Sequence, residues 1–227
     1  VILTGGEPFL REEIVEICAL FHRIGVQSVS IPTNGILTER ITDCVSQILR
    51  STSLDELKIN VSLDGTREVH DSIRNVPGCY DRACETIARL KDLRQTHRNL
   101  HVSVSCVLSQ ENISNLEEFI RVAGALQVPL MFAFIRGAES NGFGIAPEDR
   151  RDFNPRTSDC VDEPAEFDKI QEILEREGKT LGIESWNIFQ QLKLRYSIDV
   201  LRNKKYPLTC LAGHVDGVIH NNGDFSI

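Results

Sequence analysis

The chain alternates between short apolar runs and longer segments in which apolar residues recur every three or four positions. Short runs of this kind predict strands, and the longer periodic segments predict amphipathic helices. Strands are predicted over residues 1–4, 26–31, 57–63, 100–108 and 129–135. Helices are predicted over residues 11–24, from Thr38 with the apolar face Ile41, Val45, Ile48 and Leu49, around Ala83, Ile87, Leu90 and Leu93, and over residues 116–126.

A strand followed by a helix, repeated along the chain, favours an α/β fold with a parallel sheet, here part of a (β/α) barrel with outer helices. Gly25 is expected to end the first helix, and Thr38 is expected to cap the second. The residues after the third strand, which include His70, Asp71 and Arg74, are expected to form a short ordered loop before the next helix.

The pattern changes after residue 137. Residues 138–164 are rich in Gly, Asn, Asp, Arg and Pro and predict a long loop, followed by helices over residues 165–177 and 186–203. From Tyr206 the runs become short and strand-like, and the last ten residues predict a hairpin. The chain therefore divides into a barrel core (1–137), a closing or linking segment (138–205) and the start of a small second domain (206–227).

Polar residues and glycines gather where the predicted strands end. Because the carboxyl ends of parallel strands share one edge of the sheet, we expect these residues to line a single site. Glycine has no Cβ and lets a ligand approach the main chain closely, and proline stiffens the turn. The sets are Gly5-Gly6-Glu7-Pro8, Thr33-Asn34-Gly35, Ser62 with Asp64-Gly65, Asn112 and Arg136.

Composition narrows the class of protein. With 41% hydrophobic and 26% charged residues the chain has the make-up of a globular protein, and a net charge of −8 disfavours non-specific nucleic-acid binding. No apolar run reaches the roughly 20 residues that a membrane helix needs. Seven scattered cysteines do not form a disulfide framework and favour a reducing cytoplasm, with Cys18, Cys44 and Cys106 as core residues.

The strand-end motifs resemble those of one enzyme family. Thr4-Gly5-Gly6-Glu7-Pro8 resembles the GGE motif of the radical S-adenosylmethionine (SAM) enzymes, and Thr33-Asn34-Gly35 resembles the TNG that ends a later strand in many of them. Ser62-Leu63-Asp64-Gly65, followed by His70-Asp71 and Arg74, resembles a run common in the branch that carries a C-terminal SPASM extension. Cys210-Leu211-Ala212-Gly213, with Gly223 ten residues later, resembles the start of that extension.

The resemblance implies a cofactor and residue roles. Gly5, Gly6 and Glu7, with Pro8 stiffening the turn, would receive the SAM ammonium group, with Thr33 and Asn34 nearby. Ser62 and Asp64 would hydrogen-bond the ribose or carboxylate region, and Arg74 would offer a bidentate fork to the SAM carboxylate. Cys210 would ligate an auxiliary iron–sulfur cluster.

The family's own 4Fe–4S cluster is held by a CxxxCxxC motif, and none of the seven cysteines has that spacing. The chain is therefore expected to be part of a longer protein. The resemblance implies that the parent enzyme takes an electron from a donor, cleaves SAM reductively to a 5′-deoxyadenosyl radical and abstracts hydrogen from a substrate, expected to be a peptide or protein.

Two other readings of the residues stay open. The first is a (β/α) barrel enzyme of another class, such as a metal-dependent hydrolase or an aldolase, using Glu7, Asp64 and His70. The second is a non-catalytic relative that binds a peptide, which the missing CxxxCxxC motif would suit.

Overall fold

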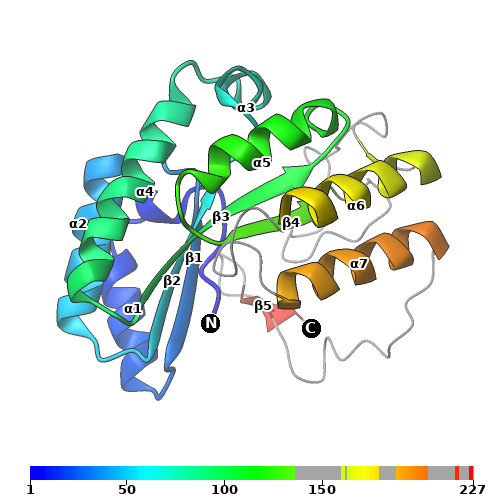
Figure 1. The fold of residues 1–227 in the computed structure, drawn as a ribbon. Helices are drawn as coiled ribbons and strands as arrows, with labels where there is room; N and C mark the ends of the chain where they lie inside the picture. The colour runs from blue at the N-terminus through cyan, green and yellow to red at the C-terminus, as the bar shows by residue number, and fades with distance from the viewer. Residues whose placement is uncertain (136–159, 162, 179–187, 204–217, 220–224, 227) are drawn as a thin grey trace.

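The computed structural model describes residues 1–135, 160–161, 163–178, 188–203, 218–219 and 225–226. Its centre is a four-stranded sheet, with every neighbouring pair parallel and the strands in chain order (Figure 1). The strands are β1 (Ser28–Thr33), β2 (Glu56–Ser62), β3 (Leu100–Leu108) and β4 (Leu130–Phe134). Because a parallel neighbour needs a crossover connection, each pair of strands is joined through at least one helix.

Helices account for most of the remaining described residues. They are α1 (Ile14–Arg23), α2 (Thr38–Ser51), α3 (Arg67–Arg74), α4 (Cys79–Thr96), α5 (Leu116–Gly124), α6 (Pro164–Gly178) and α7 (Ile188–Asn203), with short 3-10 helices η1 (Pro8–Leu10) and η2 (Ile113–Asn115). Figure 1 shows α1, α2 and α4 together on one side of β1–β3, with α6 and α7 beside β4. The α/β partial-barrel prediction is confirmed.

The two faces of the sheet differ in chemistry. Side chains alternate along each strand, and one set is buried beneath the helices; in β2 this set is Leu57, Ile59 and Val61. The other set in β2 comprises Glu56, Lys58, Asn60 and Ser62, all partly exposed. Parallel sheets are usually apolar on both faces, so a polar second face is a departure that needs a functional explanation.

The N-terminal segment runs beside β1. Ile2 forms a single parallel bridge with Ser30, supported by Leu3 N to Ser30 O and Ser30 N to Val1 O, both 2.9 Å. The predicted strand over residues 1–4 is thus correct in its pairing but not in its length. The chain turns away at Gly5, whose φ is +150°, before a regular ladder can form.

Two local predictions were wrong. The segment with His70, Asp71 and Arg74 is helix α3 rather than a loop; its few apolar residues hide the helical period, and it ends at Asn75 with φ +51°. Thr38 does not cap α2 with its side chain, because its hydroxyl donates to Arg82 O at 3.3 Å and accepts from Thr86 Oγ1 at 2.8 Å. Tertiary partners on α4 therefore replace the local cap.

The remaining element predictions differ mainly at their boundaries. The first helix begins at Ile14 rather than at residue 11, and β1 runs two residues further than expected, through Pro32. The C-terminal hairpin is present as β5 (Val218–Ile219) antiparallel to β6 (Phe225–Ser226). The three-part domain division stays a prediction, and most of the 138–164 segment, with Arg136 and Cys210, lies outside the described residues.

The core cysteines are where the sequence pattern predicts them. Cys18, Cys44 and Cys106 are all buried among apolar side chains. Burial raises the pKa of Cys18 to about 12, and it raises the pKa of Cys106 well above its usual value, so these thiols stay protonated at neutral pH. In the part of the chain that the structure describes, no helix is both long and apolar enough to cross a bilayer.

Candidate functional site at the carboxyl edge of the sheet

The Glu7 carboxylate ties the first turn to the end of β1. Its Oε1 accepts hydrogen bonds from the Thr33 hydroxyl at 2.8 Å and from Phe9 N at 3.2 Å, and its Oε2 accepts from Asn34 N at 2.8 Å. A carboxylate offers about four lone-pair positions, so roughly one remains for an outside donor. Glu7 is therefore a clamp between the first turn and the end of β1 as well as a candidate ligand-binding group.

The turn before this clamp presents bare main chain. Gly5 and Gly6 are exposed, and a Cβ added at either would meet no atom within 4 Å. Within the described residues, neither of their carbonyl oxygens accepts a hydrogen bond. Two free carbonyls beside a carboxylate are the acceptors that an ammonium group requires.

The Thr33-Asn34-Gly35 turn is held rigidly by its own hydrogen bonds. Thr33 Oγ1 accepts from Gly35 N at 3.1 Å, and Asn34 Oδ1 accepts from Ile36 N at 2.9 Å. Gly35 has φ +74° and packs so closely on Val61 that a Cβ would lie 2.8 Å from Val61 Cγ1. This glycine is thus required by both conformation and space.

Strand register brings Ser62 to the same edge. Thr33 pairs with Val61, and Ser62 pairs with Ser105 of β3, so the ends of β1, β2 and β3 lie in one row. Ser62 is partly exposed on the polar face of the sheet. The structure therefore brings Gly6, Asn34 and Ser62 to one edge of the sheet, as the sequence predicts.

Asp64 lies just past β2, and each of its polar atoms has a partner. Its carboxylate accepts from Val107 N at 3.1 Å and from Arg74 Nη2 at 2.6 Å. Its N–H donates to His70 Nδ1 at 3.1 Å, and its carbonyl accepts from Asn112 Nδ2 at 2.8 Å. The carboxylate side chain is only 5% exposed, so Asp64 joins the ends of β2 and β3 to α3.

Arg74 stands between this buried carboxylate and solvent. One nitrogen binds Asp64, and the side chain is 34% exposed. A guanidinium carries five N–H donors, and within the described residues no other partner is found for them. Arg74 is therefore a partly exposed cation, held in place by Asp64, with donors left for an anionic group.

Comparison with known proteins identifies the family. Residues 1–123, more than half of the chain, match the family model described as the Radical SAM superfamily. The chain belongs to the radical SAM superfamily. Members of this superfamily use SAM and a 4Fe–4S cluster, so the predicted family and cofactors are confirmed at that level.

Individual relatives support the assignment. The chain is 28% identical over 153 residues to the AdoMet-dependent heme synthase of Methanosarcina barkeri, covering 66% of this chain and 41% of the relative. It is 32% identical over 139 residues to mycofactocin maturase MftC of Mycobacterium tuberculosis, covering 60% and 32%. It is 33% identical over 129 residues to a probable GTP 3′,8-cyclase of Saccharolobus islandicus, covering 56% and 38%. The chain thus spans well under half the length of these relatives.

A solved structure shares the fold. The structure of hexahistidine-tagged anSMEcpe with bound AdoMet matches with a TM-score of 0.51 and 14% identity, covering 82% of this chain and 48% of that one. At this identity the match supports the radical SAM fold alone. None of the comparisons tests the SPASM-type extension predicted from Cys210.

The residues of this radical SAM chain fit the two cofactors differently. The open carbonyls of Gly5 and Gly6 beside Glu7 fit the ammonium group of SAM. No CxxxCxxC spacing occurs in the sequence, and within the described ranges no three His, Cys, Asp or Glu side chains group as metal ligands. The cluster therefore does not fit the residues present.

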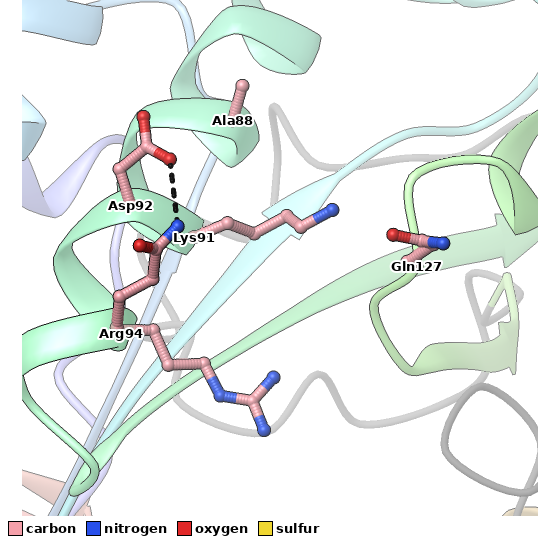
Figure 2. A pocket seen from close by; sticks show the side chains of 6 residues that line it. Ala88, Lys91, Asp92, Arg94 and Gln127 are labelled. Atoms are coloured by element: carbon pink, nitrogen blue, oxygen red, sulfur yellow. Dashed lines mark hydrogen bonds between the residues drawn. The ribbon is translucent and has the colours of Figure 1, made fainter.

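A cavity in the described part of the radical SAM chain lies elsewhere. It has a volume of about 570 Å³ and is lined by Lys91, Asp92, Arg94 and other residues of α4, with Gln127 from the loop before β4 (Figure 2). Lys91 extends toward that loop and donates to Leu126 O at 2.6 Å. Residues 126 and 127 precede β4, so this cavity is at the amino ends of the strands, opposite the carboxyl edge at which SAM is predicted to bind, the SAM edge.

His70 is the one buried imidazole of the described site, and burial lowers its pKa, an effect that Asp64 opposes and Arg74 reinforces. Since Nδ1 accepts from Asp64 N, the neutral ring carries its proton on Nε2. The unfolded chain takes up a proton near the ordinary pKa of 6.5, whereas the folded chain does so only at lower pH. Stability is therefore complete above pH 6.5 and is lost as pH falls below it.

Because of His70, we expect the unfolding free energy to fall by up to about 1.4 kcal/mol for each pH unit by which the pH drops below 6.5. The measurement is urea unfolding of the full-length protein at pH 7.5 and 5.5. His70→Asn keeps an acceptor oxygen but does not titrate, and it should show a smaller difference between the two pH values. An equal pH dependence in both proteins would show that His70 does not carry the effect.

Sequence reasoning did not single out three partly exposed residues of the polar face, Ser30, Asn60 and Ser103. Asn60 Nδ2 donates to Ser30 Oγ at 2.9 Å, and Ser103 Oγ donates to Asn60 Oδ1 at 2.6 Å. Alternation of polar and apolar residues in β2 was the available signal, but it is also the ordinary pattern of a solvent-facing strand. Only the side-chain hydrogen bonds of the folded structure showed that the three residues adjoin one another.

Proposed function

We propose that this chain is the SAM-binding part of a radical SAM enzyme that acts on a peptide or protein. The observation that carries the proposal is the Glu7 clamp, which holds the open Gly5–Gly6 main chain against the end of β1. Family membership supplies the reaction class. The similarity to a protein named as a mycofactocin maturase supports a peptide as the substrate in this proposal.

Each residue at the edge has a part in holding SAM. The Gly5 and Gly6 carbonyls, with the remaining lone pair of Glu7, accept the ammonium group. Pro8, which opens η1, and Thr33, which donates to Glu7, keep this carboxylate in place. The Asn34 side chain and Ser62 lie beside the bound molecule.

Arg74 and Asp64 work as a pair. Arg74 offers its remaining N–H donors to the SAM carboxylate, a contact that suits its forked geometry. Asp64 was predicted to touch the ribose directly, but its 5% exposed carboxylate is occupied by Arg74 and Val107 N. Its part in the proposal is therefore revised to positioning Arg74.

When bound and reduced by one electron from a donor, SAM would undergo cleavage of the bond between its sulfonium sulfur and C5′, releasing methionine and supplying a 5′-deoxyadenosyl radical that removes a hydrogen atom from a substrate. The chain's own residues bind and orient it; acid–base groups are not required. Because this sequence lacks the cluster motif, we propose that the cluster ligands belong to other parts of the parent protein. The electron donor and an auxiliary cluster at Cys210 remain parts of the same proposal.

The test is anaerobic reconstitution of the full-length protein with iron and sulfide, followed by SAM and dithionite. We expect 5′-deoxyadenosine to accumulate, measured by chromatography with mass detection. If a fully reconstituted protein produces none, the radical SAM activity is absent. If it binds a peptide under the same conditions, the non-catalytic alternative holds instead.

Gly6→Val is expected to weaken SAM binding at least tenfold without unfolding the protein. The added side chain meets no protein atom within 4 Å at its Cβ, and Gly6 has no positive φ, so the fold tolerates it. It would occupy the space through which a ligand reaches the carbonyls. Calorimetric titration with SAM measures the affinity, and Ser114→Val, at an exposed position on η2, is the control. Unchanged affinity in Gly6→Val would remove this turn from the site.

A further inference from the structure

The polar face of the sheet carries a chain of side-chain hydrogen bonds across three strands. Ser103 on β3 donates its hydroxyl proton to Asn60 Oδ1 at 2.6 Å, and Asn60 on β2 donates through Nδ2 to Ser30 Oγ on β1 at 2.9 Å. We call Ser30, Asn60 and Ser103 the ladder. Parallel sheets normally cover both faces with apolar side chains, so three linked polar residues at mid-strand indicate a polar occupant.

The ladder has a direction. Ser103 has given its only proton to Asn60, so its oxygen has lone pairs left to accept a hydrogen bond. Ser30 has accepted from Asn60, so its own hydroxyl proton is left to donate. Within the described residues, no other side-chain or main-chain group donates to the Ser103 oxygen or accepts from the Ser30 hydroxyl. The ladder thus ends in a donor on β1 and an acceptor on β3.

The charged side chains next to the ladder are paired with each other. Lys58, the next residue of β2 on this face toward the amino end, is paired with Glu56 at 2.6 Å. In the other direction lies Ser62, one side-chain layer nearer to the SAM edge. A charged ligand group would find no free counter-charge here among these neighbours, whereas a neutral group that both accepts and donates hydrogen bonds would be satisfied.

The spacing suits an extended peptide. Neighbouring strands lie about 4.8 Å apart, and Ser30 pairs with Lys58 whereas Ser103 pairs with Asn60, two residues further along β2, so Ser30 and Ser103 are separated by roughly 12 Å. An extended chain advances about 3.3 Å per residue, so about three to four residues span that distance. A peptide crossing the strands can place a carbonyl on the Ser30 hydroxyl and an N–H on Ser103 Oγ.

We infer that the ladder binds the main chain of the substrate peptide, one side-chain layer below the SAM edge. The Ser30 hydroxyl donates to a peptide carbonyl, and Ser103 Oγ accepts from a peptide amide N–H. The inference rests on the proposed function and specifies its substrate: an uncharged stretch of extended peptide, recognised through main-chain groups rather than through side-chain charge. Asn60 orients both hydroxyls and is a positioning residue.

The experiment uses the full-length, SAM-loaded protein and two probes, acetyl-Gly-Gly-Gly-amide and its analogue with an ester in place of the central amide N–H. Dissociation constants come from ligand-observed NMR titration. One hydrogen bond between neutral groups changes affinity by about fivefold. We expect the peptide to bind about fivefold more tightly than the ester, and Ser103→Ala to abolish that difference.

Two further variants complete the design. Asn60→Leu removes both ladder bonds and should weaken peptide binding fivefold or more, whereas Ser105→Ala, on the same face but outside the ladder, should leave it within twofold. If Asn60→Leu fails to fold, the comparison of peptide with ester in wild type and Ser103→Ala still decides. Equal affinities for peptide and ester in the wild-type protein, or no peptide binding, would overturn the inference.

SAM affinity and 5′-deoxyadenosine formation are measured on the same samples. If SAM binds and is cleaved while peptide and ester do not differ, the ladder inference fails and the proposed function stands. If SAM is not cleaved, the proposed activity fails, whatever the probes show. The two failures are therefore distinguishable.

Discussion

Asp64→Ala is expected to lower the unfolding free energy by about 3 kcal/mol and to weaken SAM binding at least tenfold. Removing one partner of a buried ion pair typically costs about 3–5 kcal/mol, because the other charge is left without compensation. The lower end applies because Arg74 is 34% exposed and water can solvate it in part. Val107 N also loses its acceptor, which adds to the loss.

Guanidinium unfolding and SAM titration of the full-length protein measure the two effects of the Asp64 substitution. Glu56→Ala breaks the exposed pair with Lys58 and should change neither quantity measurably, since both side chains are 42% exposed. Asp64→Asn keeps an acceptor for Val107 N and removes only the charge. If Asp64→Asn binds SAM as tightly as wild type, Arg74 does not depend on that charge for its placement.

Gly35→Ala is expected to destabilise the protein by about 3 kcal/mol. Gly35 has φ +74°, a conformation that costs an alanine roughly 1–2 kcal/mol. The new Cβ would also lie 2.8 Å from Val61 Cγ1 and 3.0 Å from Ala83 Cα, and overpacking of this kind costs about 1–3 kcal/mol. Relief of this clash would move the Thr33-Asn34 turn away from Glu7, so SAM affinity should fall as well.

Gly78→Ala is the matched control for Gly35→Ala. Gly78 has nearly the same φ, +77°, but a Cβ there meets nothing within 4 Å, so only the conformational cost applies. The difference between the midpoints of denaturant unfolding therefore isolates the clash at β2 and α4. Equal destabilisation by the two substitutions would mean that the close packing around Gly35 adds nothing to the loss of unfolding free energy.

Local pattern was sufficient for most elements. The alternation in β2 and the periodicity of α2 arise from residues close together in sequence, and both elements were predicted. The eight-residue helix α3 was missed because its one fully buried side chain is His70, a polar residue. Its helical face becomes apparent only when His70 is seen to pack against Tyr80 of α4, with ring centroids 6.2 Å apart.

For the candidate site, the location could be predicted from the sequence but the hydrogen-bond partners of its residues could not. Strand-end glycines and carboxylates could be assigned to one edge because parallel strands end on the same side. Their partners could not, since Asp64 meets Arg74 ten residues later and Val107 forty-three residues later. A direct contact from Asp64 to a ligand was therefore a reasonable expectation that burial of its carboxylate revised.

The amino-acid sequence alone determined the order of the strands and of most helices, the edge of the sheet where a ligand is expected to bind, and the resemblance to the radical SAM family. These follow from short-range periodicity and from motifs of a few adjacent residues. Only the tertiary structure decided that Glu7 clamps the first turn to the end of β1, that Asp64 holds Arg74, and that Ser30, Asn60 and Ser103 form one hydrogen-bonded line. Such contacts depend on strand register and burial, which relate residues distant in the chain and leave no local pattern.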